Sequence, residues 1–111
     1  MMLTQANNLL PAYTPSPGEI LEVEIAARGW SQRQFASIID KPPQAINEIL
    51  RAKKQITPET ALRIAAALGT SPELWINLET EYRLSLARQA ISSNVLAEIA
   101  QRSGQAVQKV D

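Results

Sequence analysis

Residues 31–51 read SQRQFASIIDKPPQAINEILR, two short apolar-periodic segments that are joined only by Asp40-Lys41-Pro42. The apolar residues of both segments recur at helical spacing, and no part of the chain alternates with the period of two that indicates a strand. A linker of this length between two helices is typical of a helix-turn-helix unit. The sequence therefore predicts an all-α fold organised around this turn.

Capping residues place the other helices, because the first N–H groups of a helix need side-chain acceptors. Four residues have the sequence context of an N-cap, being followed by Glu or Gln at the capping-box spacing or by Pro-Glu: Ser16, Ser31, Thr57 and Ser71. Gly29 and Gly69 are expected to end the first and fourth helices. We therefore expect five helices within residues 16–90.

The two flanks of this domain differ from it in composition. Residues 1–15 are polar and contain prolines, so we expect an extended arm. Ser92-Ser93-Asn94 predicts a break, after which Val95 to about Arg102 predicts a sixth, short helix. A frayed tail is expected from Ser103-Gly104 onward. Residues 91–111 are thus interpreted as a short C-terminal helical extension.

The composition excludes most enzyme chemistry. Cysteine and histidine are both absent from the 111 residues, which excludes disulfides, thiol nucleophiles, Cys/His zinc sites and imidazole bases. Acid pairs such as Glu79 and Glu81 are expected on different helix faces, without basic or metal-binding partners at useful spacing. No cofactor or metal is expected, and an enzyme is the weakest interpretation.

We expect a cytoplasmic protein with no membrane partner. The N-terminal residues lack a basic flank followed by an apolar run, and no stretch approaches the roughly 20 apolar residues of a membrane span. The formal net charge is zero, which by itself argues against a nucleic-acid partner. Residues 28–63, however, contain seven basic and three acidic residues, so a basic region coincides with the predicted helix-turn-helix.

The second helix of the unit has the pattern of a groove-reading helix. When Ile46, Ile49 and Leu50 are placed inward, Gln44, Glu48 and Arg51 point outward and Asn47 lies on the flank: QAINEILR, residues 44–51. Gln can pair with adenine, Glu can accept from cytosine, and Arg can approach guanine or a phosphate. Gln32, Lys53 and Lys54 stand where such domains contact the DNA backbone.

Several short motifs recur in an order and spacing that resemble the HigA-type antitoxins, a branch of the XRE helix-turn-helix family. They are Pro17-Gly18-Glu19-Ile20-Leu21, Ser31-Gln32 through Ala36, Ile46-Asn47-Glu48-Ile49, Ile56-Thr57-Pro58-Glu59-Thr60-Ala61-Leu62-Arg63, Leu68-Gly69-Thr70-Ser71-Pro72-Glu73-Leu74-Trp75 and Asn77-Leu78. The resemblance covers roughly residues 16–88. It implies a five-helix XRE/lambda-repressor-like domain that binds double-stranded operator DNA as a homodimer, autorepresses its operon, neutralises a HigB/RelE-like mRNA-cleaving toxin and has no catalytic activity.

Site residues follow from the resemblance together with the pattern above. The predicted DNA-binding residues are Gln32, Pro43, Gln44, Asn47, Glu48, Arg51, Lys53 and Lys54. The apolar stripe of the fifth helix predicts a dimer interface of Leu74, Leu78, Tyr82 and Leu86. The chain departs from the family pattern at five places: Ser16 replaces a usual His, Asp40 a usual Gly, Lys41 a usual apolar residue, Pro43 a frequent polar reader, and Arg51-Ala52-Lys53 a glycine-containing turn.

Two other functions compete with the antitoxin interpretation. One is a stand-alone XRE-type repressor without a toxin, which would share the fold and the DNA site. The other is a protein-interaction module that no longer binds DNA, which the zero net charge and Pro43 favour. The toxin surface is open among the arm, the C-terminal segment 90–111 and an acidic face, for which the candidates are Glu19, Glu22, Glu24, Glu73, Glu79 and Glu81.

Overall fold

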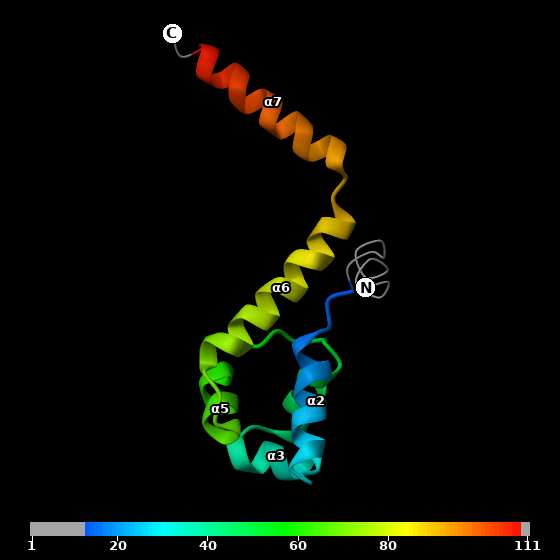
Figure 1. Ribbon diagram of the computed structural model, residues 1–111, viewed down its shortest axis with the longest axis vertical. Coiled ribbons are helices and arrows are strands. Elements are labelled where there is room, and N and C mark those ends of the chain that lie inside the picture. The colour runs from blue at the N-terminus through cyan, green and yellow to red at the C-terminus, as the bar shows by residue number, and fades with distance from the viewer. Residues whose placement is uncertain (1–12, 110–111) are drawn as a thin grey trace, which may run out of the picture.

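The computed structural model describes residues 13–109, and the side chains of residues 13–105. All regular structure in this part of the chain is α-helical, as predicted (Figure 1). The helices are α2 (Pro17–Ala27), α3 (Gln32–Ile39), α4 (Pro43–Leu50), α5 (Pro58–Leu68), α6 (Pro72–Ala90) and α7 (Ser93–Lys109). The five expected helices correspond to α2–α6. The expected arm lies mostly outside the described residues.

The predicted starts of α2, α3, α5 and α6 and the predicted glycine ends are confirmed. Each expected N-cap side chain accepts a hydrogen bond from the backbone N–H three residues further on, at 3.1–3.3 Å: Ser16, Ser31, Thr57 and Ser71. Gly29 and Gly69 have φ values of 73° and 75°, the left-handed conformation that ends a helix. The local sequence therefore specifies where these helices start and stop.

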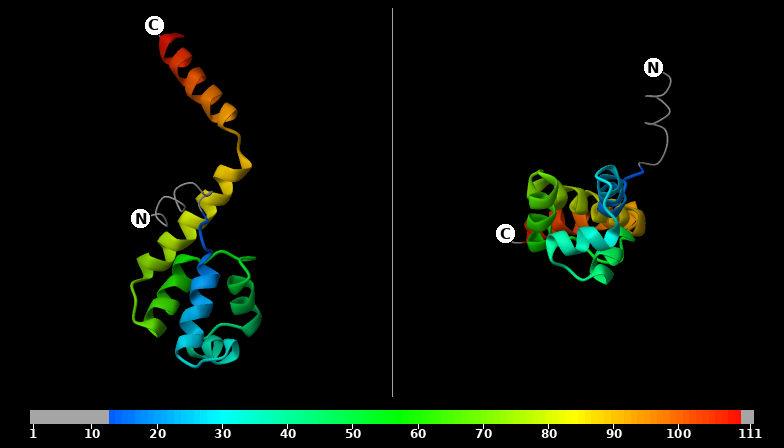
Figure 2. Two further views of the ribbon diagram at one scale, coloured as in Figure 1. Left: turned by 45° about the vertical axis from the view of Figure 1, so that its right-hand side comes forward. Right: turned by 90° about the horizontal axis from the view of Figure 1, so that it is seen from below.

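Helices α2–α5 and the first half of α6 surround a single core, and Figure 2 shows them gathered into one body. The largest fully buried side chains include one from each helix: Leu21, Phe35, Ile46, Ile64 and Trp75. Burying such side chains stabilises the fold by about 1.5–3 kcal/mol each. The core thus fixes the two helices of the helix-turn-helix against the other three.

Gly18 sets the distance between α2 and α4. A Cβ atom added at Gly18 would lie 2.3 Å from the carbonyl oxygen of Ile49 and 2.5 Å from that of Leu50. These are backbone atoms, which cannot move aside as a flexible side chain can. Only glycine permits this approach of α2 to the C-terminal end of α4.

Among the described residues, two other than glycine adopt the left-handed conformation, and both lie in turns that flank α4. Asp40 ends α3 with φ 58°, and Ala52 follows α4 with φ 61°. Aspartate tolerates this region better than most residues, whereas alanine has no polar side chain to compensate for the crowded Cβ. Both turns that lack the usual glycine therefore still adopt the positive φ that glycine favours.

Helix α7 is longer than expected. It runs through Ser103-Gly104 to Lys109, where a frayed tail was predicted, so that prediction is wrong. The predicted break before it is confirmed, because Ile91 is extended and Ser92 accepts a hydrogen bond from the N–H of Val95 at 3.2 Å. A single Gly inside a helix costs only about 1 kcal/mol, which neighbouring helix-forming residues can offset.

The chain has an elongated shape because α6 and α7 project from the body (Figures 1 and 2). The radius of gyration is 19.1 Å, against about 13 Å for a compact domain of this size. No helix among the described residues is long and apolar enough to cross a membrane.

Candidate nucleic-acid interface

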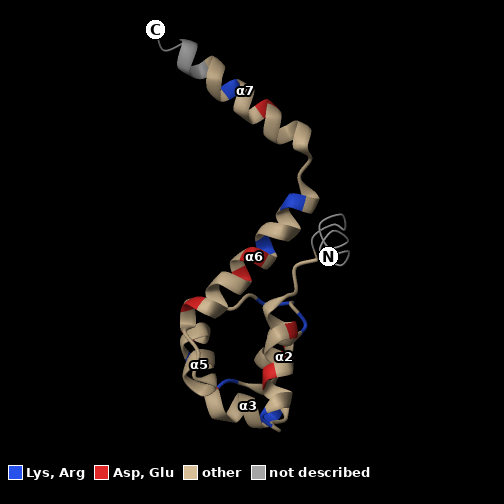
Figure 3. Ribbon diagram, viewed as in Figure 1, with Lys and Arg blue, Asp and Glu red and all other residues tan. Residues whose placement is uncertain are grey.

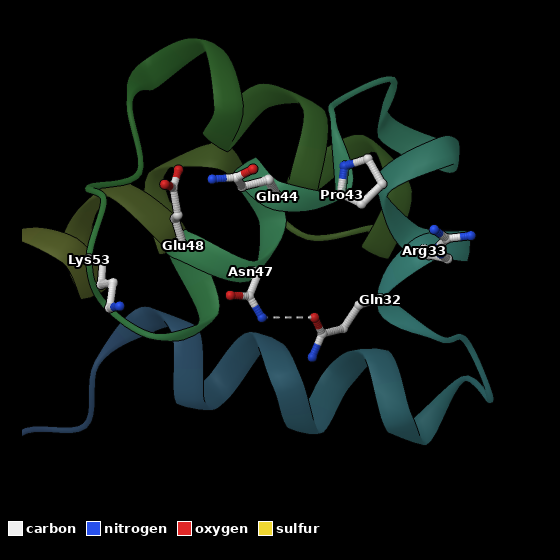
Figure 4. Close-up of a pocket in the computed structure, with 7 residues that line it drawn as sticks. All are labelled: Gln32, Arg33, Pro43, Gln44, Asn47, Glu48 and Lys53. Atoms are coloured by element: carbon white, nitrogen blue, oxygen red, sulfur yellow. Dashed lines mark hydrogen bonds between the residues drawn. The ribbon is translucent and has the colours of Figure 1, made fainter.

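A shallow concavity opens where the N-terminal turn of α3 meets the outer face of α4 (Figure 4). Its volume is about 490 Å³. Seven residues line it: Gln32, Arg33, Pro43, Gln44, Asn47, Glu48 and Lys53. Six of these seven belong to the predicted DNA-binding set. The structure therefore brings together residues that the sequence separates by up to 21 positions.

The core determines which face of α4 is exposed. Ile46, Ile49 and Leu50 are buried, and Pro43 and Gln44 are exposed on the opposite side. Asn47 and Glu48 are half-buried at the edges of the exposed face. The helical arrangement predicted from the apolar spacing is thus confirmed.

The two helices are linked at the floor of the concavity. Asn47 donates from Nδ2 to Oε1 of Gln32, at 3.4 Å (Figure 4). This bond uses the acceptor of Gln32, so the amide group of Gln32 is oriented with its N–H donors away from Asn47. An amide held in this way can donate to an acceptor such as a phosphate oxygen.

The turn after α4 places two lysines beside the concavity. The backbone N–H groups of Lys53 and Lys54 donate to the carbonyl oxygen of Glu48 at 2.8 and 3.2 Å. The Glu48 carboxylate lies 3.8 Å from Lys54 Nζ, so a cation accompanies the one acid in the site. Lys54 and Arg51 are exposed, but neither lines the concavity.

Arg33 is a residue that the sequence reasoning undervalued. The sequence pattern indicated only that Arg33 is one of the seven basic residues of 28–63, yet it lies at the end of the concavity opposite Lys53 (Figure 4). Its position in the first turn of α3, one residue after the predicted DNA-contacting Gln32, could have indicated that it belongs to the same site. The concavity is therefore flanked by a cation at each end, with polar residues between them.

Comparison with known proteins identifies the family. The sequence model of the helix-turn-helix family matches residues 23–75, from within α2 to the first turn of α6. Virulence-associated protein I of Dichelobacter nodosus is 37% identical over 90 residues, which is 80% of this chain and 82% of that protein. The Pseudomonas aeruginosa antitoxin HigA, solved with the higBA promoter, has a TM-score of 0.68 at 30% identity, over 70% of this chain and 86% of that one.

A HigA-family addiction module antidote protein from Coxiella burnetii has a TM-score of 0.62 at 32% identity, over 86% of this chain and 92% of that one. The chain belongs to the HigA-type branch of the XRE helix-turn-helix family. The resemblance found in the sequence is therefore confirmed, and this HigA-type chain is a helix-turn-helix DNA-binding regulator by family.

Not all basic residues of the 28–63 region of this HigA-type chain are available to a ligand. Arg28 donates to the carbonyl oxygen of Leu68 at 3.1 Å, and Arg63 donates to that of Ile39 at 2.9 Å. These two arginines satisfy carbonyl groups at the C-terminal ends of α5 and α3. Their role in the structure is to hold helix ends in place.

Lys41 is also held, through Glu59. Its Nζ donates to Glu59 Oε1 at 2.9 Å, and Arg63 Nε donates to the other carboxylate oxygen at 2.6 Å. The hydrogen bonds from Lys41 and then Arg63 lower the pKa of Glu59 below its usual value. The exposed cations next to α4 are therefore a smaller set: Arg33, Arg51, Lys53 and Lys54.

The predicted dimer residues lie in two environments along α6. Leu78 and Tyr82 are half-buried, and Leu78 packs against the core of its own chain. Leu74 and Leu86 are exposed at opposite ends of the helix. Beyond Leu86, further exposed apolar residues follow at Ile91 and, on α7, at Val95, Leu96 and Ile99.

The acids of α2 are less available than the sequence suggested. Glu19 completes the cap of Ser16 and accepts a hydrogen bond from the Tyr13 hydroxyl, which lowers the pKa of Glu19 and raises that of Tyr13. Glu24 forms an ion pair with Arg28 at 2.8 Å. Glu22 is exposed. Only part of the proposed acidic face on α2 therefore remains for a partner.

Glu79 is a clear correction. Predicted as a surface acid without a basic partner, it is buried, and its carboxylate accepts from Arg83 Nε one turn later and from the N–H of Ile56 at 2.8 Å. Glu73 and Glu81 are exposed as expected. Figure 3 shows that the acids of α6 lie in its first half and the basic residues in its second half.

Proposed function

We propose that this protein is the antitoxin of a type II toxin–antitoxin pair, which binds operator DNA as a homodimer, autorepresses its operon and neutralises a HigB/RelE-like mRNA-cleaving toxin. The observation that carries the proposal is the polar concavity on α3 and α4, whose ends hold Arg33 and Lys53 and whose floor displays Gln44 and Asn47. The family membership supports the same function.

DNA recognition follows from the geometry of α4. An exposed α4 face with Pro43 at its first turn fits the major groove, where Gln44 can form a bidentate contact to adenine. Glu48 can accept from a cytosine amino group, while Lys54 beside it offsets its repulsion from the phosphates. Arg33, Gln32, Lys53, Lys54 and Arg51 are assigned to the DNA backbone, whose contacts orient α4 in the groove.

We assign the homodimer interface to the end of α6 and to α7, which project from the body. Leu86 is 40% exposed, and on α7 Val95, Leu96 and Ile99 are 39%, 50% and 50% exposed. Residues 95, 96 and 99 share one face of a helix. An isolated helix of this length is marginal in water unless its apolar face is packed, so α7 requires a partner to be stable.

The toxin contact is assigned to the acidic residues that the fold leaves exposed. A ribonuclease presents a positive surface to RNA, and an acidic surface is complementary to it. Glu22 on α2 and Glu73 and Glu81 on α6 meet this requirement, whereas Glu79 does not because it is buried. These acids lie on other elements than α4, so toxin and DNA can bind together.

Coexpression with the product of the neighbouring reading frame tests the proposal. A stable complex that rescues growth and retards an operator duplex is the expected result. Operator binding without any complex would identify a stand-alone XRE-type repressor, and a complex without operator binding would identify a protein-interaction module. The variant Glu22→Lys should slow complex formation and leave operator affinity unchanged, with Ala66→Lys at an exposed position of α5 as a control for added charge.

A further inference from the structure

Glu79, which is buried, and Arg83, which is half-buried, form an ion pair whose hydrogen bonds reach the backbone of the turn after α4. Glu79 is 6% exposed, and both of its carboxylate oxygens are used. Oε1 accepts from the N–H of Ile56, and Oε2 accepts from Arg83 Nε. A buried carboxylate is tolerated only when it is paired and hydrogen-bonded in this way. Both oxygens of the Glu79 carboxylate are therefore satisfied within the protein. Neither Glu79 nor Arg83 lines the concavity.

The pair holds both ends of the turn that follows α4. Arg83 donates from its second terminal nitrogen to the carbonyl oxygen of Ala52 at 3.5 Å, and Glu79 accepts from Ile56 at the other end. Between these points lie Lys53 and Lys54, whose side chains are exposed. The turn is thus attached to α6 on one side.

The same turn is attached to α4 on its other side. The carbonyl oxygen of Glu48 accepts from the N–H groups of both Lys53 and Lys54, and Ala52 adopts φ 61° to make this possible. Alanine disfavours that conformation, so the turn needs contacts from outside itself to hold it. Arg83 and Glu79 supply such contacts from a helix that begins 16 residues after Ile56.

We propose that Glu79 and Arg83 are positioning residues for DNA-backbone binding: they hold Lys53 and Lys54 in the orientation that contacts phosphates. The inference rests on the proposed operator binding and adds residues of α6 to that site. A turn that is ordered before DNA arrives loses less conformational entropy on binding, so its lysines contribute more affinity. The pair acts through these lysines and does not itself contact DNA.

A purely structural role for the pair has a different consequence. If Glu79 and Arg83 only stabilised the body, their replacement would lower the unfolding temperature and leave the folded protein's phosphate contacts intact. The salt dependence of DNA binding separates the two roles, because its slope counts the counterions that phosphate contacts release, about 0.9 per contact on duplex DNA. It can be measured well below the unfolding temperature.

The test compares Arg83→Met with Arg88→Met, which removes the same charge from an exposed position near the end of α6. Binding of an operator duplex and of a random duplex is measured over a series of salt concentrations. For Arg83→Met we expect the slope to fall by about one to two units on both duplexes, and affinity at low salt to fall about tenfold. The ratio of operator to random affinity should stay within about twofold, since base contacts are untouched. Arg88→Met should leave the slope nearly unchanged.

Adding Lys53→Ala to Arg83→Met tests whether Arg83 acts through the turn. The expected combined loss is smaller than the sum of the two single losses, as for residues that act as a unit. An unchanged slope in Arg83→Met, or fully additive losses, would overturn the inference. Arg83→Lys, which keeps the charge but has no forked donor, replaces Arg83→Met if circular dichroism shows the latter unfolded, and should lower the slope as well.

These outcomes are separable from failure of the proposed function. If the wild-type chain does not prefer its operator to random DNA, the operator proposal fails. The slope on random DNA still reports phosphate contacts in that case, so the positioning role is decided independently.

Discussion

The apolar residues of the body, α2–α6, and those of helix α7 differ in how far they are buried. In the body the large apolar side chains converge on one core, and exposed ones such as Val23 on α2 and Leu62 on α5 lie on different helices. On α7 Val95, Leu96 and Ile99 lie on one face, and all three are exposed. Single exposed apolar residues are ordinary on a protein surface, whereas a contiguous face indicates a contact site. The body is therefore complete in one chain, and α7 is not.

Substituting two glycines tests this comparison with the largest expected effect. Gly18→Ala should destabilise the body by about 3 kcal/mol, because the added Cβ meets the backbone of Ile49 and Leu50. Gly104→Ala on α7 meets nothing within 4 Å and should favour the helix by roughly 0.5–1 kcal/mol. Urea unfolding reports the first change, and helix content by circular dichroism reports the second. A stability loss from Gly104→Ala as large as that from Gly18→Ala would refute the distinction.

Ile99→Glu should abolish the dimer without unfolding the body. Because a palindromic operator binds two linked copies, affinity for the full site should fall at least about 100-fold, while a half-site is bound as before. Sedimentation and gel retardation measure the two effects. Val23→Glu, an equally polar change at an exposed residue of the body, is the matched control. A wild-type chain that sediments as a monomer at tens of micromolar would contradict the prediction.

We expect only residues of the body, and none of α7, to discriminate between base pairs. Gln44→Ala should relax discrimination at one base pair by about 1–3 kcal/mol, both in the wild-type background and in Ile99→Glu. Lys53→Ala should instead weaken all sequences alike and lower the salt slope by about one unit. Competition assays with operators altered at single positions measure the discrimination. Equal losses on operator and random DNA for Gln44→Ala would rule out the orientation of α4 in the groove.

The smallest expected effect lies at the turn after α4. Ala52→Gly should stabilise the body by roughly 0.5–1 kcal/mol, because glycine adopts φ 61° without steric cost. Ala66→Gly, at an exposed position inside α5, should have the opposite sign and cost about 1 kcal/mol. Thermal or urea unfolding of the two variants gives the comparison. The same sign for both would mean that Ala52 is not strained.

Local sequence signals account for much of what was predicted correctly. Ser16, Ser31, Thr57 and Ser71 cap the helices that they were predicted to cap, since a cap depends on residues only three positions apart. The spacing of Ile46, Ile49 and Leu50 predicted the exposed face of α4 for the same reason. The length of α7 was missed because Ser103-Gly104 is a weak breaker, which the surrounding helix overrides.

The sequence by itself determined the helices, their order and the residues that α4 displays, because helix caps and apolar periodicity act over one or two turns. Only the tertiary structure decided which charged residues are free. Arg28 and Arg63 bind carbonyl groups of other helices, and Glu79 is buried against the N–H of Ile56. Each of these contacts joins residues at least 23 positions apart, a distance over which charge patterning carries no information and the packing of the helices determines which groups meet.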